Sequence, residues 1–116
     1  MRQVLVADDH MGSCQAIKVF LENRLPGLEV LIAHTLEDTL EILCDNAPDV
    51  LVIDTELQGL KSDLEVDMLR SYFPKGLIIF TSTKPEIARM ISEEKDIRFF
   101  DKSTSAEYLL NLMQIN

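Results

Sequence analysis

Several features of specialised protein classes are scarce or missing in this 116-residue sequence. It has no tryptophan and only 6% aromatic residues, so few side chains could stack on a flavin ring. Its four glycines form no glycine-rich phosphate loop of the nucleotide-binding kind. No apolar run approaches the roughly 18 residues that a membrane span needs, and no signal peptide is recognisable. We therefore expect a soluble, cytoplasmic protein without membrane contact.

Basic residues and cysteines are also few. The chain has 11 Lys and Arg against 20 Asp and Glu, which gives a net charge of −9 and a pI near 4.5. Such a surface repels phosphate backbones, so we expect no direct nucleic acid contact by this chain. Cys14 and Cys44 have no second cysteine or histidine at metal-ligand spacing. They are predicted to be free core thiols in a reducing compartment.

Apolar residues, in contrast, make up 47% of the sequence and occur in short runs separated by amphipathic stretches. At this length they supply one core, so residues 1–116 are predicted to form one domain. Runs rich in β-branched and aromatic residues predict five strands, at residues 4–7, 30–33, 50–53, 77–80 and 97–100. The first, third and fourth runs are apolar throughout, as expected of parallel strands covered on both faces.

The segments between these runs place apolar residues at helical spacing. The predicted stripes are Ile17, Phe20, Leu21 and Leu25; Leu36, Leu40 and Leu43; Leu64, Met68 and Leu69; Ile87, Met90 and Ile91; and Tyr108, Leu109 and Leu112. Three hydroxyl residues followed by an acid predict helix starts: Thr35 with Asp38, Ser62 with Glu65 and Thr104 with Glu107. The predicted fold class is α/β, a single (βα)5 flavodoxin-like doubly wound domain. Its five-stranded parallel sheet has the order 2-1-3-4-5, with helices on both faces.

Polar residues at the strand ends mark the expected site of such a fold, because ligands bind beyond the carboxyl ends where the strand order reverses. Asp8 and Asp9 follow the first strand, and Asp54 follows the third. Thr81 ends the fourth strand, and Lys102 closes the fifth. Taken singly, the first two could cap a helix, the hydroxyl could be an ordinary strand residue and the lysine a solvated charge. Their occurrence at four strand ends favours a functional role.

Three clustered carboxylates repel one another, so the site is expected either to hold a proton or to recruit a cation. Mg²⁺ suits such a site, because it prefers oxygen ligands and takes only one or two carboxylates. Held by Asp9 and Asp54, it would leave positions for phosphoryl oxygens. Asp54 would then attack a phosphoryl group and form an aspartyl phosphate, with Lys102 and Thr81 contacting the phosphoryl oxygens.

Four segments at these strand ends together resemble the receiver domains of two-component response regulators: VLVADDH, DVLVID, IIFTS and FFDKS. The resemblance spans the whole chain. It implies a phosphoacceptor, Asp54, that receives its phosphoryl group from a histidine kinase or a histidine phosphotransfer protein. The implied Mg²⁺ ligands are Asp8, Asp9, Asp54 and the backbone carbonyl of Glu56. The implied switch and phosphoryl-binding residues are Thr81, Lys102 and Phe99.

Such a domain is a switch and not a turnover enzyme: it phosphorylates itself with Mg²⁺ and slowly loses the phosphoryl group to water. It would control an output, with transcription expected, through a domain that lies outside this chain, and it could form a homodimer. His10 after the acid pair resembles the NarL/LuxR-type subfamily, but an ordinary loop histidine is an equal alternative. No partner is evident for His34.

Two loops depart from the family pattern. Residues 55–59, TELQG, stand where the family usually has Met-Pro, and Ser103 stands where a proline commonly follows the lysine. A phosphatase of the haloacid-dehalogenase type is disfavoured, because that family carries its nucleophile in an Asp-x-Asp pair at the first strand. A degenerate receiver that acts as a phosphorylation-independent interaction module remains the alternative.

Overall fold

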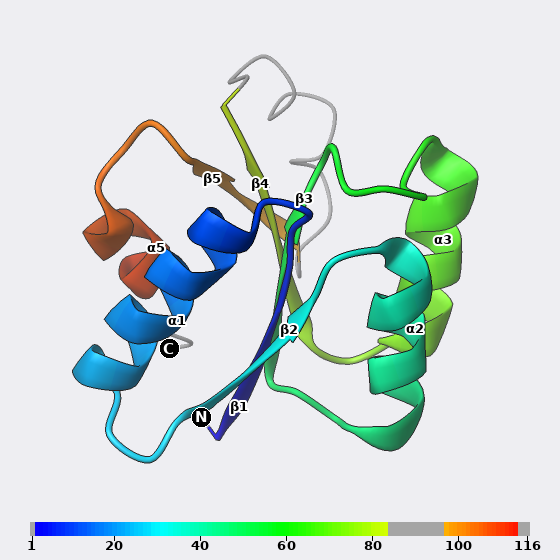
Figure 1. Ribbon diagram of the computed structural model, residues 1–116. Coiled ribbons are helices and arrows are strands. Elements are labelled where there is room, and N and C mark those ends of the chain that lie inside the picture. The colour runs from blue at the N-terminus through cyan, green and yellow to red at the C-terminus, as the bar shows by residue number, and fades with distance from the viewer. Residues whose placement is uncertain (1, 84–96, 114–116) are drawn as a thin grey trace.

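The computed structural model describes residues 2–83 and 97–113 (Figure 1). Its strands are β1 (Gln3–Ala7), β2 (Glu29–Ala33), β3 (Val50–Asp54), β4 (Leu77–Ser82) and β5 (Ile97–Asp101). Its helices are α1 (Met11–Arg24), α2 (Leu36–Asp45), α3 (Asp63–Tyr72) and α5 (Ala106–Met113). The helix predicted around Ile87, Met90 and Ile91 lies outside the described residues. Within the described ranges, no helix is both long and apolar enough to cross a membrane.

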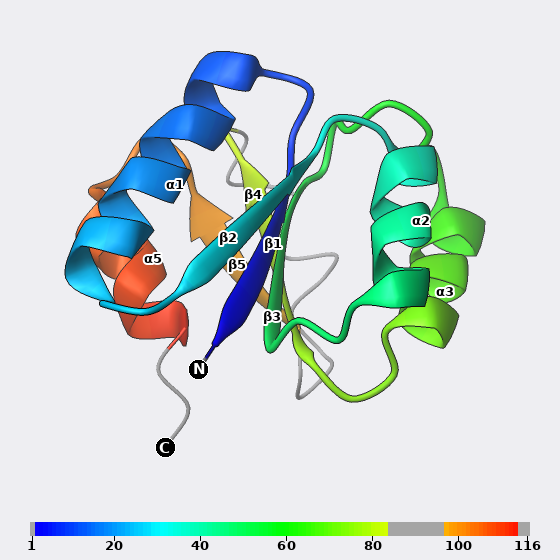
Figure 2. The ribbon, with the colours of Figure 1, turned by 60° about the horizontal axis from the view of Figure 1, so that its bottom comes forward.

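The five strands form one parallel sheet in the order β2-β1-β3-β4-β5. The helices α1 and α5 cover one face, and α2 and α3 cover the other (Figures 1 and 2). The predicted fold class and strand order are therefore confirmed. The chain leaves β1 toward β2 on one side and returns to β3 on the other, so the strand order reverses beside β1.

Two core clusters explain why β1 and β3 are apolar at every position except Gln3 and Asp54. Val4 and Val52 belong to the cluster under α1 and α5, together with the fully buried Leu21. Leu5 and Leu51 belong to the cluster on the α2–α3 side. Successive strand residues point to opposite faces, and here both faces are covered, so neither set can be polar.

The apolar stripe predicted for α3 is wrong in two of its three positions. Leu69 is fully buried, but Leu64 and Met68 are 74% and 43% exposed. The inward face instead contains Val66 and the C-cap residue Phe73, which pack into the α2–α3 core cluster with Leu69. These three residues are spaced three and four apart, as on one helix face. Leu64 and Met68 are also four residues apart, but they lie on the exposed side of α3.

Two further side-chain predictions need correction. Tyr108 was expected in the inward stripe of α5 but is exposed, whereas its neighbour Leu109 is fully buried. Cys14 is a buried free thiol, as predicted, but Cys44 is exposed on α2 and is no core residue. A single-residue shift around a helix turns a side chain by about 100°, which is enough to move it from core to solvent.

Two of the predicted helix starts are confirmed. The hydroxyl of Thr35 accepts a hydrogen bond from the backbone N of Asp38 at 3.1 Å. The hydroxyl of Ser62 accepts from the backbone N of Leu64 at 3.3 Å and donates to Oε1 of Glu65 at 2.8 Å. These bonds satisfy amides that the first turns of α2 and α3 would otherwise leave unpaired.

The loop after β3 turns at Gly59 against the beginning of α2. Gly59 has φ +99°, and a Cβ there would lie 2.9 Å from Cβ of Leu36. Because both the backbone conformation and the space oppose a side chain, Gly59→Ala is expected to lower the free energy of unfolding by about 1–3 kcal/mol in urea denaturation.

Gly12 in α1 is the matched control, since a Cβ there would meet nothing within 4 Å. Gly12→Ala should therefore raise the stability by about 0.5 kcal/mol. Equal effects of the two substitutions would contradict the strain assigned to the loop.

Candidate functional site

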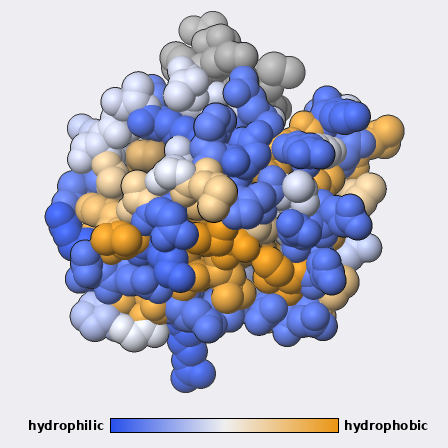
Figure 3. Space-filling model, in the orientation of Figure 1, coloured by the Kyte–Doolittle hydropathy of each residue, from blue (hydrophilic) through white to orange (hydrophobic). Residues whose placement is uncertain are grey.

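The carboxylates predicted from the sequence meet where β1 and β3 end side by side. Ala7 pairs with Ile53, so Asp8 and Asp54 are the next residues along neighbouring strands. Both are almost fully buried, and Asp9 is partly exposed beside them. One ligand atom each of Asp8, Asp9, Asp54 and His10 lies within 4.8 Å of the others. Figure 3 shows hydrophilic residues gathered over this upper end of the sheet.

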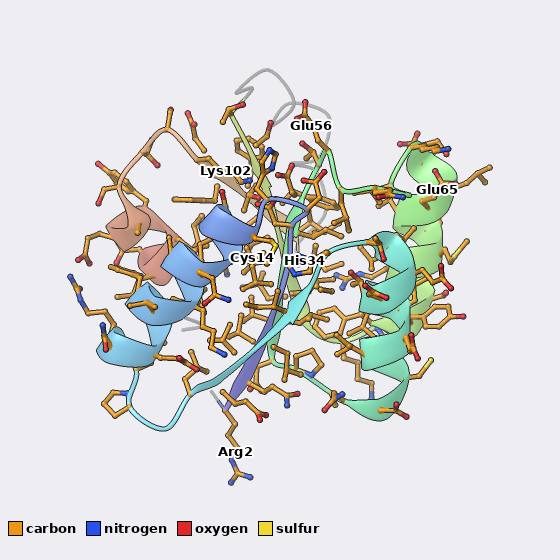
Figure 4. The ribbon with its side chains drawn as sticks, in the orientation of Figure 1. Arg2, Cys14, His34, Glu56, Glu65 and Lys102 are labelled. Carbon is orange, nitrogen blue, oxygen red and sulfur yellow. The ribbon has the colours of Figure 1, made fainter. Side chains whose placement is uncertain are left out.

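The ammonium group of Lys102 contacts two of these carboxylates. Nζ donates to Oδ2 of Asp54 at 2.6 Å and also to Oδ2 of Asp8. The lysine is mostly buried at this edge of the sheet (Figure 4). Charge-assisted bonds of this kind compensate the removal of buried charges from water. Lys102 thus brings one positive charge to a cluster for which the sequence predicted either a bound proton or a cation.

The pKa of Lys102 reflects two opposing effects. Burial alone would lower this pKa, but the hydrogen bonds to Asp54 and Asp8 outweigh burial and raise it above its ordinary value. A raised pKa in the folded state means that the charged lysine stabilises the fold below its unfolded-state pKa. That contribution is lost only as the pH rises through the raised value, so it is fully present at neutral pH.

The backbone carbonyl of Asp8 is held by two donors that the sequence did not reveal. The Cys14 thiol donates to this oxygen at 3.3 Å, and Nδ1 of His34 lies 3.0 Å from it. Because a carbonyl only accepts, Nδ1 of His34 carries the proton. Burial, together with the nearby charge of Asp8, raises the pKa of Cys14 to about 11, so the thiol keeps the proton that it donates. The position of His34 directly after β2, next to β1, was the signal that could have identified it.

The backbone of Glu56, two residues after Asp54, binds the other oxygen of the Asp54 carboxylate. The backbone N of Glu56 donates to Oδ1 of Asp54 at 2.8 Å. Asp54 therefore has one oxygen fixed by this amide and the other by Lys102. The Glu56 side chain itself is exposed above this end of the sheet (Figure 4).

Thr81 lies on β4, the strand next to β3, and Phe99 lies on β5, one strand further out. Thr81 is buried and is the register partner of Asp54 on β4, and its carbonyl accepts a bond from the backbone N of Thr55 at 3.0 Å. Phe99 pairs with Phe80 across β4 and β5 and packs, partly buried, against the α2–α3 core cluster. The sheet thus places the hydroxyl residue beside the central acid and the aromatic residue one strand further away.

The donor set fits a divalent cation. At their formal charges, three carboxylates and one ammonium carry a net charge of −2 at this edge of the sheet (−3 + 1 = −2). Asp9 and the exposed rim of the cluster give an ion access from solvent. Clustered carboxylate oxygens of this kind are the ligands that Mg²⁺ prefers in proteins.

The comparisons with known proteins agree with this geometry. The family model of the response regulator receiver domain matches residues 4–114. The chain belongs to the response regulator receiver domain family. A search of curated protein sequences gave no match.

Solved structures share the receiver fold at low sequence identity. The chemotaxis response regulator CheY4 of Vibrio cholerae is 23% identical with a TM-score of 0.81, and the alignment covers 98% of this chain and 97% of that one. A response regulator of Burkholderia pseudomallei, solved with a phosphorylated aspartic acid, a calcium ion and citrate, is 22% identical with a TM-score of 0.81, over 100% of this chain and 68% of that one. A LuxR family DNA-binding response regulator of Silicibacter pomeroyi is 25% identical with a TM-score of 0.77, over 96% and 86%.

The receiver loop after β3 keeps a defined shape without the usual Met-Pro. The backbone N of Leu57 donates to the carbonyl of Asp54 at 3.1 Å, which closes a tight turn. Further along, the backbone N of Leu36 donates to the carbonyl of Gln58 at 2.8 Å. The start of α2 therefore holds the segment that follows the central acid.

The receiver loop after β5 is likewise organised without a proline, by Asp101. Its Oδ1 accepts from the backbone N of Ser103 at 2.9 Å and from the Ser103 hydroxyl at 2.7 Å, which lowers the pKa of Asp101. Thr104 donates its hydroxyl to the Asp101 carbonyl at 2.7 Å and is not the cap of α5. The predicted Thr104 start is wrong, because Ser105 takes that place and accepts from the backbone N of Glu107 at 3.3 Å.

Removing the lysine should reveal the repulsion between the receiver's acids. Lys102→Ala is expected to lower the free energy of unfolding at neutral pH by about 3 kcal/mol in EDTA, because it leaves buried carboxylates without a cation. Mg²⁺ should then stabilise this variant more than the unsubstituted protein, since the ion replaces the missing charge.

Urea denaturation with and without Mg²⁺ measures both effects. Lys75→Ala is the control, because Lys75 is exposed and far along the chain from the acids, and it should change stability by less than about 0.5 kcal/mol. Equal Mg²⁺ stabilisation of Lys102→Ala and the unsubstituted protein would contradict the assignment.

Proposed function

We propose that this receiver domain is a phosphorylation-activated switch in which Asp54 accepts a phosphoryl group from a histidine kinase or a histidine phosphotransfer protein. The observation that supports it most is the setting of Asp54. Its carboxylate is buried at a strand end, held by the Glu56 amide and the Lys102 ammonium, and adjoined by two further acids. A nucleophile so held is fixed in orientation before the donor arrives.

In the proposed transfer, an Asp54 oxygen attacks phosphorus as the bond from phosphorus to the donor's imidazole nitrogen breaks. The electron pair of that bond returns to the imidazole, which then takes up a proton. Lys102 would leave its carboxylate partner and donate to a phosphoryl oxygen, because the new oxygens carry more negative charge than the carboxylate they replace. Thr81, on the neighbouring strand, would donate its hydroxyl to another phosphoryl oxygen.

Asp8, Asp9, Asp54 and the backbone carbonyl of Glu56 would hold Mg²⁺ in this proposal. When bound, the ion neutralises negative charge as the phosphoryl group approaches the acids. The protein supplies the oxygen ligands from the neighbouring ends of β1 and β3. The bonds from Cys14 and His34 to the Asp8 carbonyl fix one of these ends.

The expected output of the switch is control of transcription by a domain outside this chain. The 25% identity to a LuxR family DNA-binding response regulator and the acid pair followed by His10 support a NarL/LuxR-type relationship. Movement of Thr81 toward the phosphoryl group and of Phe99 would carry the signal along β4 and β5. The phosphoryl group would be lost slowly to water, so the domain does not act as a turnover enzyme.

The proposal includes partners and location. The net charge of −9 argues that DNA contacts belong to another domain, and a second copy of the chain is a further candidate partner. Two unpaired thiols, one of them exposed, favour a reducing compartment such as the cytoplasm. A phosphorylation-independent interaction module is not favoured, because it would retain the repulsion of three carboxylates without using it.

The phosphoacceptor assignment is tested by intact mass after incubation with acetyl phosphate. One phosphoryl adduct is expected with Mg²⁺ and none in EDTA. Asp54→Asn should abolish the adduct while circular dichroism remains unchanged, since the amide keeps the shape of the side chain.

Asp45→Asn is the control, because Asp45 is exposed at the end of α2. It should leave the adduct intact. An adduct on Asp54→Asn at the same site, or no adduct on the unsubstituted protein, would reject the proposed function.

A second test follows the signal from the site to β5. Lys102→Ala should still accept some phosphoryl group, because the nucleophile and the acids remain. The phosphorylation-dependent NMR shifts of the β5 backbone amides should be much smaller, since the contact that links Lys102 to the phosphoryl group is lost. Shifts equal to those of the unsubstituted domain would show that Lys102 does not couple phosphorylation of Asp54 to β5.

A further inference from the structure

The imidazole of His10 lies against the same acids and makes no contact that the helix needs. His10 is the N-cap residue of α1, but its side chain makes no capping hydrogen bond. Its Nδ1 lies 3.1 Å from Oδ1 of Asp9 and 3.3 Å from Oδ1 of Asp8. A nitrogen donor is thus placed on the open side of the carboxylate cluster.

The backbone around His10 fixes where this imidazole can be. The backbone N of His10 donates to Oδ1 of Asp8 at 2.9 Å, and the carbonyl of His10 accepts the first helical bond from the backbone N of Cys14 at 3.1 Å. The side chain is 67% exposed, so it can turn toward an ion that enters from solvent. The loop therefore holds the histidine at the cluster and leaves its ring accessible.

An imidazole changes the class of metal that such a cluster favours. Carboxylate and carbonyl oxygens suit Mg²⁺, whereas imidazole nitrogen is a preferred ligand of the first-row transition ions. We propose that His10 is a metal ligand, and that with Asp8, Asp9 and Asp54 it makes a site for divalent transition ions such as Mn²⁺. This inference rests on the proposed function in one respect only: it takes Asp8, Asp9 and Asp54 as metal ligands.

The second histidine of the chain provides the matched contrast. Nδ1 of His34 lies 3.0 Å from the Asp8 carbonyl, and His34 is not among the residues whose ligand atoms gather within 4.8 Å of one another. Both histidines thus lie near Asp8, but only His10 has its Nδ1 facing carboxylate oxygens.

The experiment uses the full chain freed of metal with EDTA, loaded with Mn²⁺ and kept without a phosphodonor. Pulsed EPR should detect ¹⁴N coupling from a histidine nitrogen bound to Mn²⁺. The coupling should vanish in His10→Gln and persist in His34→Gln. In competition titrations, His10→Gln should weaken Mn²⁺ binding by about tenfold and change Mg²⁺ binding by less than about twofold.

Three results would overturn the inference: no nitrogen coupling in the unsubstituted protein, coupling that persists in His10→Gln, or an equal loss of Mn²⁺ and Mg²⁺ affinity. Labelling the unsubstituted protein with ¹⁵N-histidine supplies a test that needs no variant, because a bound histidine must change the coupling pattern. Nitrogen coupling without acetyl phosphate labelling of Asp54 would reject the proposed function alone. Labelling without coupling would reject only the role of His10.

Discussion

The contact of one ammonium group with two buried carboxylates is the interaction on which the carboxyl edge of this sheet depends. Lys102 follows β5, whereas Asp8 follows β1 and Asp54 ends β3, so the contact joins chain segments up to 94 residues apart. Charges buried in this way need close partners, because the loss of water costs several kcal/mol per ion. Lys102 therefore links the carboxyl ends of β1 and β3 to the loop after β5 through its contacts with Asp8 and Asp54.

The same constraint makes the edge suitable as a switch. A phosphoryl group would compete with the carboxylates for Lys102, and a divalent ion would compete with Lys102 for the carboxylates. Either change would therefore act on the residue that directly follows β5. The backbone N of Lys102 donates to the carbonyl of Ser82 at 2.9 Å, which links this change to the end of β4 as well. Phe99 lies on β5 itself, three residues before the lysine. In the proposed switch, a local change of charge would reach the half-buried ring of Phe99 through three residues of chain.

The sheet and the meeting of the acids could be predicted from the sequence, because wholly apolar runs identify parallel strands and strand order then fixes which ends adjoin. Helix faces were less predictable: Leu64 and Met68 are apolar but exposed, since only tertiary packing decides which side of α3 turns inward. The hydrogen bonds from Cys14 and His34 to the Asp8 carbonyl could not be predicted from the sequence, for another reason. They end on a backbone atom, which every residue has, so no motif indicates them.

The contact of Lys102 with the two carboxylates is tested most directly by the NMR signal of its ammonium group in ¹⁵N-lysine-labelled protein at neutral pH, assigned by comparison with Lys102→Ala. We expect a slowly exchanging ammonium signal, distinct from those of exposed lysines, that shifts when Mg²⁺ is added and again when Asp54 is phosphorylated. An ammonium signal that exchanges as fast as those of exposed lysines and responds to neither addition would contradict this expectation.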